Sequence, residues 1–196
     1  MRARLSTLMV AAALAGVASC DEVSFPTAPT EDFQATLAGA NETPPVTSTA
    51  SGLAVFSVTL DTFLAWRLDV ATIDSTTAAH IHVGAAGVPG AILVTLFAGP
   101  TAACTATSTS PRCRVGFTGA LAQGQFVPSQ LMTQLPAGFG TTARERFDSL
   151  VVLMRNGGAY VNVHTVANSG GEIRGQTQVQ AVPLVERNIR SGGEDQ

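Results

Sequence analysis

Short apolar runs occupy residues 32–179, separated by glycine, proline, asparagine and threonine. The nine runs are 32–38, 53–60, 63–72, 79–83, 91–98, 114–118, 149–155, 159–165 and 172–179. In the second run Val55, Ser57 and Thr59 alternate with apolar neighbours, which is the period of a strand buried on one face. Many short strands with short connections predict a mainly β fold, an antiparallel β-sandwich with Greek-key-like connections.

One segment has helical spacing instead of strand alternation. Within 142–156 the apolar residues Phe147, Leu150, Val151 and Met154 recur every three to four positions. Thr141 or Thr142 is a suitable N-cap, and Gly157-Gly158 a suitable stop. Residues 128–135 suggest a second, shorter helix or turn. We therefore expect one or two short helices on connections of the β fold.

The N-terminus has the pattern of an export signal. Arg2 and Arg4 precede an apolar stretch from Leu8 to Val17, and Val17-Ala18-Ser19-Cys20 matches a bacterial lipobox. The stretch is shorter than the ~20 apolar residues that cross a membrane. We predict a lipoprotein signal peptide at 1–19 and a lipid on Cys20 that anchors the chain to a membrane of the cell envelope, in the periplasm or on the outer surface. An ordinary signal peptide is the alternative, and it would leave Cys20 as a free thiol.

Composition divides the remainder of the chain into three parts. Residues 20–31 are rich in proline, threonine and acids and are expected to form a tether. A single domain is predicted at 32–180, and the polar tail 181–196 is expected to be disordered.

The charge of the chain argues against a nucleic-acid partner. The formal net charge is −3, and the basic residues are all arginines that are scattered along the sequence. Loss of the signal peptide removes Arg2 and Arg4 and makes the charge more negative. No basic stripe is present that could neutralise phosphates.

Two cysteines remain once Cys20 is assigned to lipid. Cys104 and Cys113 flank a segment of threonine, serine and proline that is typical of a loop. In an oxidising compartment they are predicted to form a disulfide. The alternative is a pair of thiolate metal ligands, but neither cysteine has a histidine or second cysteine at zinc-site spacing.

The histidines are confined to two short motifs, AHIH at 79–82 and AYVNVHTVANSGGEIRGQ at 159–176. In an extended strand at 79–83, His80 and His82 lie on the same face. In a second strand at 159–165, Tyr160, Asn162 and His164 likewise lie on one face. If the two strands lie close together, three imidazoles converge on a candidate copper or zinc site. The candidate ligands are His80, His82 and His164, with Asn162, Glu172 or Glu42 as oxygen donors nearby.

The alternative is a polar cluster under the connecting loops, in which the histidines bond to backbone, Asn162, Glu172 and Arg174. Neither interpretation makes the chain an enzyme, and we assign no catalytic residue. Ser57 and Ser75 lack a GxSxG elbow, and the glycine-rich segments do not join a strand to a helix as a phosphate loop does.

Three motifs carry a family resemblance: LAGANETPPV (37–46), AHIH with GAAGVPGAILVTLF (84–97), and AYVNVHT followed by GEIRGQ. In order and spacing they resemble a CHRD domain, the module first defined as a repeat in chordin and also found in bacterial secreted proteins. The resemblance spans roughly 33–179, with a cysteine-bounded insertion at 101–114 as a departure. It implies an extracellular, mostly β domain and implies no reaction.

The sequence thus predicts a lipid-anchored, extracytoplasmic binding or scaffolding module with a protein or glycan partner yet to be identified. The alternative is a copper- or zinc-binding envelope protein that stores, delivers or uses the ion through His80, His82 and His164. A third interpretation is a metalloenzyme acting on a small oxidant, which would require metal-dependent turnover.

Overall fold

The structure is a computed structural model that describes residues 30–59, 62–99 and 114–180. The predicted signal peptide, Cys20, most of the tether, the Cys104–Cys113 pair and the tail lie outside these residues.

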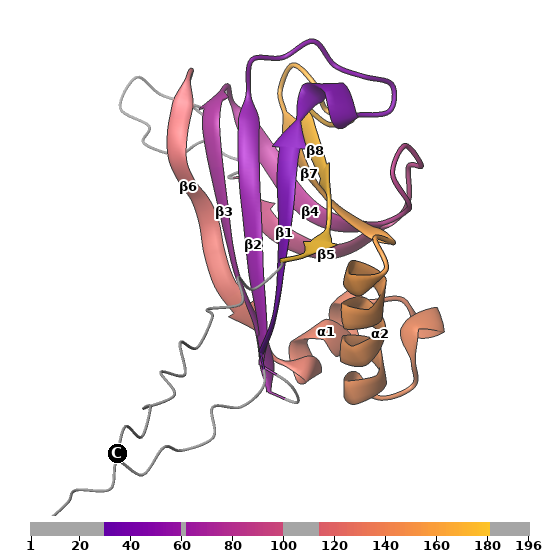
Figure 1. Ribbon diagram of the computed structural model, residues 1–196. Helices are drawn as coiled ribbons and strands as arrows, with labels where there is room; N and C mark the ends of the chain where they lie inside the picture. Colours follow the sequence, from indigo (N-terminus) through magenta and orange to yellow (C-terminus); the bar gives the residue numbers. More distant parts are fainter. Residues whose placement is uncertain (1–29, 60–61, 100–113, 181–196) are drawn as a thin grey trace, which may run out of the picture.

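The described chain is built mainly of strands (Figure 1). They are β1 (Thr30–Ala38), β2 (Ser51–Thr59), β3 (Phe63–Ile73), β4 (Thr76–Val83), β5 (Ile92–Ala98), β6 (Phe117–Phe126), β7 (Ala159–Thr165), β8 (Ile173–Gln176) and β9 (Gln178–Val179). The α-helices are α1 (Pro128–Gln134) and α2 (Ala143–Arg155), and single 3₁₀ turns span Gly39–Asn41 and Ala137–Phe139. The prediction of a mainly β, antiparallel fold with two short helices is confirmed.

All the described strands join one antiparallel sheet in the order β5-β4-β7-β8-β1-β2-β3-β6, with β9 beside β1. In Figure 1 the strands β6, β3, β2 and β1 stand side by side in one layer, and β4, β5 and β7 cross behind them. The sheet is therefore nearly closed, and its two halves face each other.

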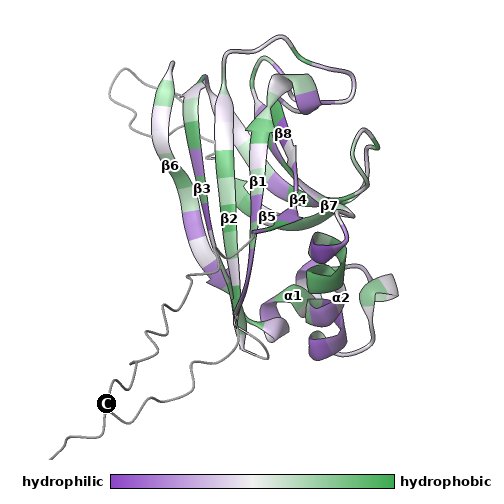
Figure 2. Ribbon diagram, viewed as in Figure 1, coloured by the Kyte–Doolittle hydropathy of each residue, from purple (hydrophilic) through white to green (hydrophobic). Residues whose placement is uncertain are grey.

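The core lies between these halves. Phe33, Leu64 and Leu68 of one half and Ile81 and Val161 of the other are all 0% exposed. Hydrophobic and hydrophilic positions alternate along the strands (Figure 2). Since alternate side chains of β4 and β7 fill the core, those between them must lie on the outer face of the sheet. That outer face carries the histidines.

Helix α2 forms where its spacing predicted it. Thr142 is the N-cap, and its hydroxyl accepts from the backbone N–H of Glu145 in a capping box. The buried residues of α2 are the four that its spacing indicated: Phe147, Leu150, Val151 and Met154. The helix packs on β7 and β9 and covers one end of the core. Among the residues described, no helix is long and apolar enough to cross a membrane.

Strand β6 is longer than the sequence indicated, because the apolar run ends at 118 whereas the strand continues to Phe126. Its glycines and glutamines resemble a loop, and tertiary pairing makes it extended: Leu64 of β3 is paired with Phe126 and Ile73 with Phe117. Gly124 permits close packing, since a Cβ there would lie 3.3 Å from the Trp66 ring. Among the described strands β6 is at the edge of the sheet, and edge strands often carry polar residues that hinder pairing with another chain.

Candidate metal site

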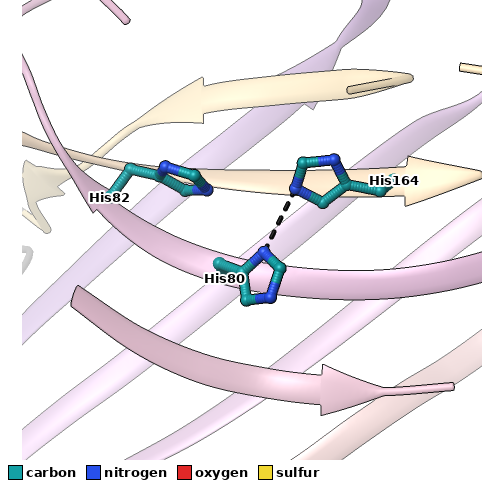
Figure 3. A group of neighbouring side chains, drawn as sticks. All are labelled: His80, His82 and His164. Carbon is teal, nitrogen blue, oxygen red and sulfur yellow. Dashed lines mark hydrogen bonds between the residues drawn. The ribbon is translucent and has the colours of Figure 1, made fainter. Parts of the chain in front are cut away.

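Strands β4 and β7 bring the three histidines together. The two strands pair antiparallel, with Ala78 opposite His164 and His80 opposite Asn162. One ring nitrogen from each of His80, His82 and His164 lies within 4.8 Å of those of the other two. Figure 3 shows the rings facing one another on the same side of the sheet. The structure thus brings the three imidazoles together into one cluster that could hold a metal ion.

Backbone carbonyls fix the orientation of two of these rings. Nδ1 of His82 lies 3.0 Å from the carbonyl oxygen of Gly90, and Nδ1 of His164 lies 2.9 Å from that of Ser169. Because a carbonyl oxygen can only accept, each Nδ1 carries the proton and each Nε2 keeps its lone pair. Histidines that bind metal ions show this pattern, in which the outer nitrogen donates to a carbonyl or carboxylate.

His80 completes the group. Its Nδ1 lies 3.1 Å from Nε2 of His164, so without an ion it donates a hydrogen bond to that lone pair. Nε2 of His82 is buried and has no hydrogen-bond partner among the described residues. A buried acceptor without a donor costs about 1–3 kcal/mol. An ion among the three rings would occupy this lone pair and remove the cost.

The three imidazoles favour their neutral forms. Burial, followed by repulsion from His164 and His82, lowers the pKa of His80 to about 4. Burial also lowers the pKa of His82 and that of His164, although the Gly90 and Ser169 carbonyls act in the opposite direction. Metal ions bind neutral imidazole, so protons compete weakly for these nitrogens at neutral pH.

A stack of side chains supports the site from one side. The His82 ring lies on Tyr160 with centroids 4.9 Å apart and planes 12° apart. The guanidinium carbon of Arg174 lies 3.3 Å from the Tyr160 ring centroid. The Tyr160 hydroxyl accepts from the N–H of Gly90 at 3.1 Å. Strand alternation indicated which face Tyr160 occupies, but neither this stack nor the two orienting carbonyls has a signal in the sequence.

The candidate oxygen donors form hydrogen bonds with other side chains. Asn162 Nδ2 donates to Glu42 Oε1 at 2.8 Å, and both residues are buried. Glu172 accepts from Thr165 at 3.0 Å and also from Ser48 and Asn168. Within 30–59, 62–99 and 114–180, no Asp, Glu or Cys joins the three-histidine group. Among the described residues, the candidate ligands are therefore the three imidazole nitrogens.

A polar cleft of about 410 Å³ opens beside this cluster. Strands β1, β8 and β9, residues 40–43 and the glycine-rich loop 84–91 surround it. Its polar walls include Gln34, Asn41, Gln176 and Gln178, with Glu42 and Arg174 as the charged members. Amide side chains of this kind donate and accept hydrogen bonds, so the cleft suits an uncharged polar ligand.

Glu42 gives the domain a pH dependence that a glutamine variant should reveal. Burial raises the pKa of Glu42 from 4.5 to about 7, although Arg174 acts to lower it. The folded protein therefore holds this proton more tightly than the unfolded chain, so the contribution of Glu42 to stability is fully present below pH 4.5 and lost as the pH rises through 7. We expect wild type to lose stability relative to Glu42→Gln between pH 4.5 and 8, measured as urea midpoints.

The lowered pKa of His80 has the opposite consequence, because its contribution to stability is lost as the pH falls from 6.5 toward 4. Both proteins keep His80, so the comparison cancels this effect. If the urea midpoints of wild type and Glu42→Gln changed in parallel from pH 4.5 to 8, Glu42 would have an ordinary pKa.

Comparisons with known proteins place the chain in a family. Neither the curated proteins nor the solved structures include a match. The family model of the CHRD domain matches residues 33–177, which contain the three-histidine cluster and the polar cleft. The chain therefore belongs to the CHRD domain family, which supports an extracellular-type binding module.

Proposed function

We propose that the chain is an exported binding module, anchored in the cell envelope by a lipid on Cys20, whose domain binds one copper or zinc ion through His80, His82 and His164. The lipobox at 17–20 supports the anchor, and the family supports an extracellular-type module. Palmitate labelling tests the anchor: wild type should incorporate label and Cys20→Ser should not. Unlabelled wild type would mean that the anchor is absent.

The observation that carries the metal proposal is the convergence of three neutral imidazoles, one of which, His82, has a buried Nε2 with no hydrogen-bond partner in the described part of the chain. Imidazole nitrogen suits copper and zinc, whereas calcium and magnesium prefer oxygen. Metal–nitrogen bonds of about 2.0–2.1 Å require nitrogens closer together than the 4.8 Å limit of this group, so the rings must move slightly inward. His80 and His164 are half-buried, so their rings are less confined than that of the buried His82.

Removal of the histidines should abolish ion binding. We expect a soluble form that begins at Asp21, and so lacks the lipidated Cys20, to take up one ion with a dissociation constant below about 1 μM when titrated by calorimetry with Cu(II) or Zn(II). Each single change to glutamine should weaken binding about 100-fold or more, because it removes one of three ligands. The triple change should eliminate binding, since the sequence has three histidines in all.

A surface change, Gln125→Ala on β6, is the control and should bind as wild type does. Circular dichroism confirms that each variant is folded. Failure of the folded wild type to bind, or full binding by the triple variant, would contradict the metal proposal.

The polar cleft supports a second candidate function, the binding of an uncharged glycan. Its amide-rich wall matches the hydroxyl groups of a sugar. NMR titration with neutral oligosaccharides should then shift the side-chain amide signals of Gln34 and Gln178, whereas the Gln176 amide already donates to the carbonyls of Gly84, Gly157 and Ala159. Unchanged signals at millimolar sugar would count against a glycan ligand.

A further inference from the structure

Given the proposed metal site, we propose that its ion is monovalent copper, Cu(I), and that Arg174, stacked on Tyr160 behind His82, disfavours the doubly charged ions Zn(II) and Cu(II). The inference stands on the number and charge of the ligands and on the position of the guanidinium.

The ligand set favours a singly charged ion. It holds three neutral nitrogens and, in the part of the chain that is described, no acidic or thiolate member. Zn(II) in proteins takes four ligands, so three histidines would leave its fourth position to water, as in catalytic zinc sites. Cu(I) carries one charge less than Zn(II) and is stable with three nitrogen ligands, so these histidines would complete its coordination without a fourth ligand. Nε2 of His82 is also buried, which limits access of water on that side of an ion.

The stack brings a positive charge close to the site. Strand β7 lies between β4 and β8, so His82 of β4 and Arg174 of β8 approach the Tyr160 ring from opposite sides. The Arg174 guanidinium also donates to the carbonyl oxygens of Ala85 and Val88, at 3.0 and 2.8 Å. These bonds hold the charge in place behind His82.

Repulsion from Arg174 grows with the charge of the ion. Coulomb energy is proportional to the product of the charges, so a divalent ion is repelled twice as strongly as a monovalent ion at the same position.

Competition titrations measure the preference of the site for Cu(I) over Zn(II). Under anaerobic conditions the soluble form that begins at Asp21, which contains every described residue, competes with bicinchoninate for Cu(I) and with a chromogenic chelator for Zn(II). We expect wild type to bind Cu(I) at least about 100-fold more tightly than Zn(II). Arg174→Gln should narrow this ratio about tenfold, mainly by strengthening Zn(II) binding. Arg174→Lys keeps the charge and should keep the ratio.

The ratio of the Cu(I) and Zn(II) affinities distinguishes an effect of the Arg174 charge from a structural role of this residue. General loosening of the loop would weaken the binding of both ions alike and leave the ratio unchanged. An unchanged ratio in folded Arg174→Gln would overturn the inference, as would tighter Zn(II) than Cu(I) binding by wild type. If Arg174→Gln does not fold, the wild-type comparison still tests the choice of ion, and Arg174→Ala takes the place of Arg174→Gln in the test of the charge. Folded wild type that binds neither ion would refute the proposed metal function itself.

Discussion

Replacing Gly90 by alanine is expected to weaken metal binding about 10- to 100-fold without touching a ligand. A Cβ at this position would lie 1.6 Å from the carbonyl oxygen of Val83. Val83 is fixed in β4 by its pairing with Ala159, so the glycine-rich loop 84–91 must move instead. That movement withdraws the Gly90 carbonyl from His82 and the Gly90 N–H from Tyr160. His82 then loses the bond that aims its Nε2 at the site.

The displaced loop should also reduce the free energy of unfolding by about 1–3 kcal/mol, as overpacking does. Calorimetry and urea denaturation measure the two effects separately. Gly170→Ala is the matched control: it follows Ser169, whose carbonyl orients His164, but its Cβ would meet no atom within 4 Å. Wild-type affinity in Gly90→Ala would show that the carbonyl does not orient the ligand.

Phe33→Ala is expected to have the largest effect on stability and little effect on the ion. Phe33 is 0% exposed and lies opposite Phe56 of β2 and Val179 of β9. Its removal should reduce the free energy of unfolding by about 3–5 kcal/mol, through lost burial and the cavity that remains. Denaturation in urea gives this value. Affinity for the ion should be unchanged in the folded variant, because the histidines occupy the opposite face of the sheet.

Leu53→Ala provides the comparison for this change. Leu53 lies on β2 and is 42% exposed, so its removal should cost less than about 1 kcal/mol. Similar losses in the two variants would mean that Phe33 is not in the core. Weakened ion binding in folded Phe33→Ala would show that the core and the histidine face are coupled.

Local patterns in the sequence determined the type of most elements and the face on which each side chain lies. The two-residue repeat of an extended chain puts Ile81 and Val161 in the core and His80, His82 and His164 on the outer face of the sheet. The spacing and cap of 142–156 likewise specified α2 and its buried residues. These properties follow from backbone geometry within a few residues, so the amino-acid order alone contains them.

Only the tertiary structure decided which strands are neighbours and what each polar group contacts. Pairing of β4 with β7 joins His80 to His164, which lie 84 positions apart. Pairing with β3 makes β6 a strand despite its polar composition. The same packing places the Gly90 and Ser169 carbonyls against the histidines and Glu42 against Asn162. Every residue has a backbone carbonyl, so the sequence does not mark which carbonyls orient a histidine. Strand pairing is non-local, so the sequence determined the faces of the two histidine strands, and folding decided that those faces meet.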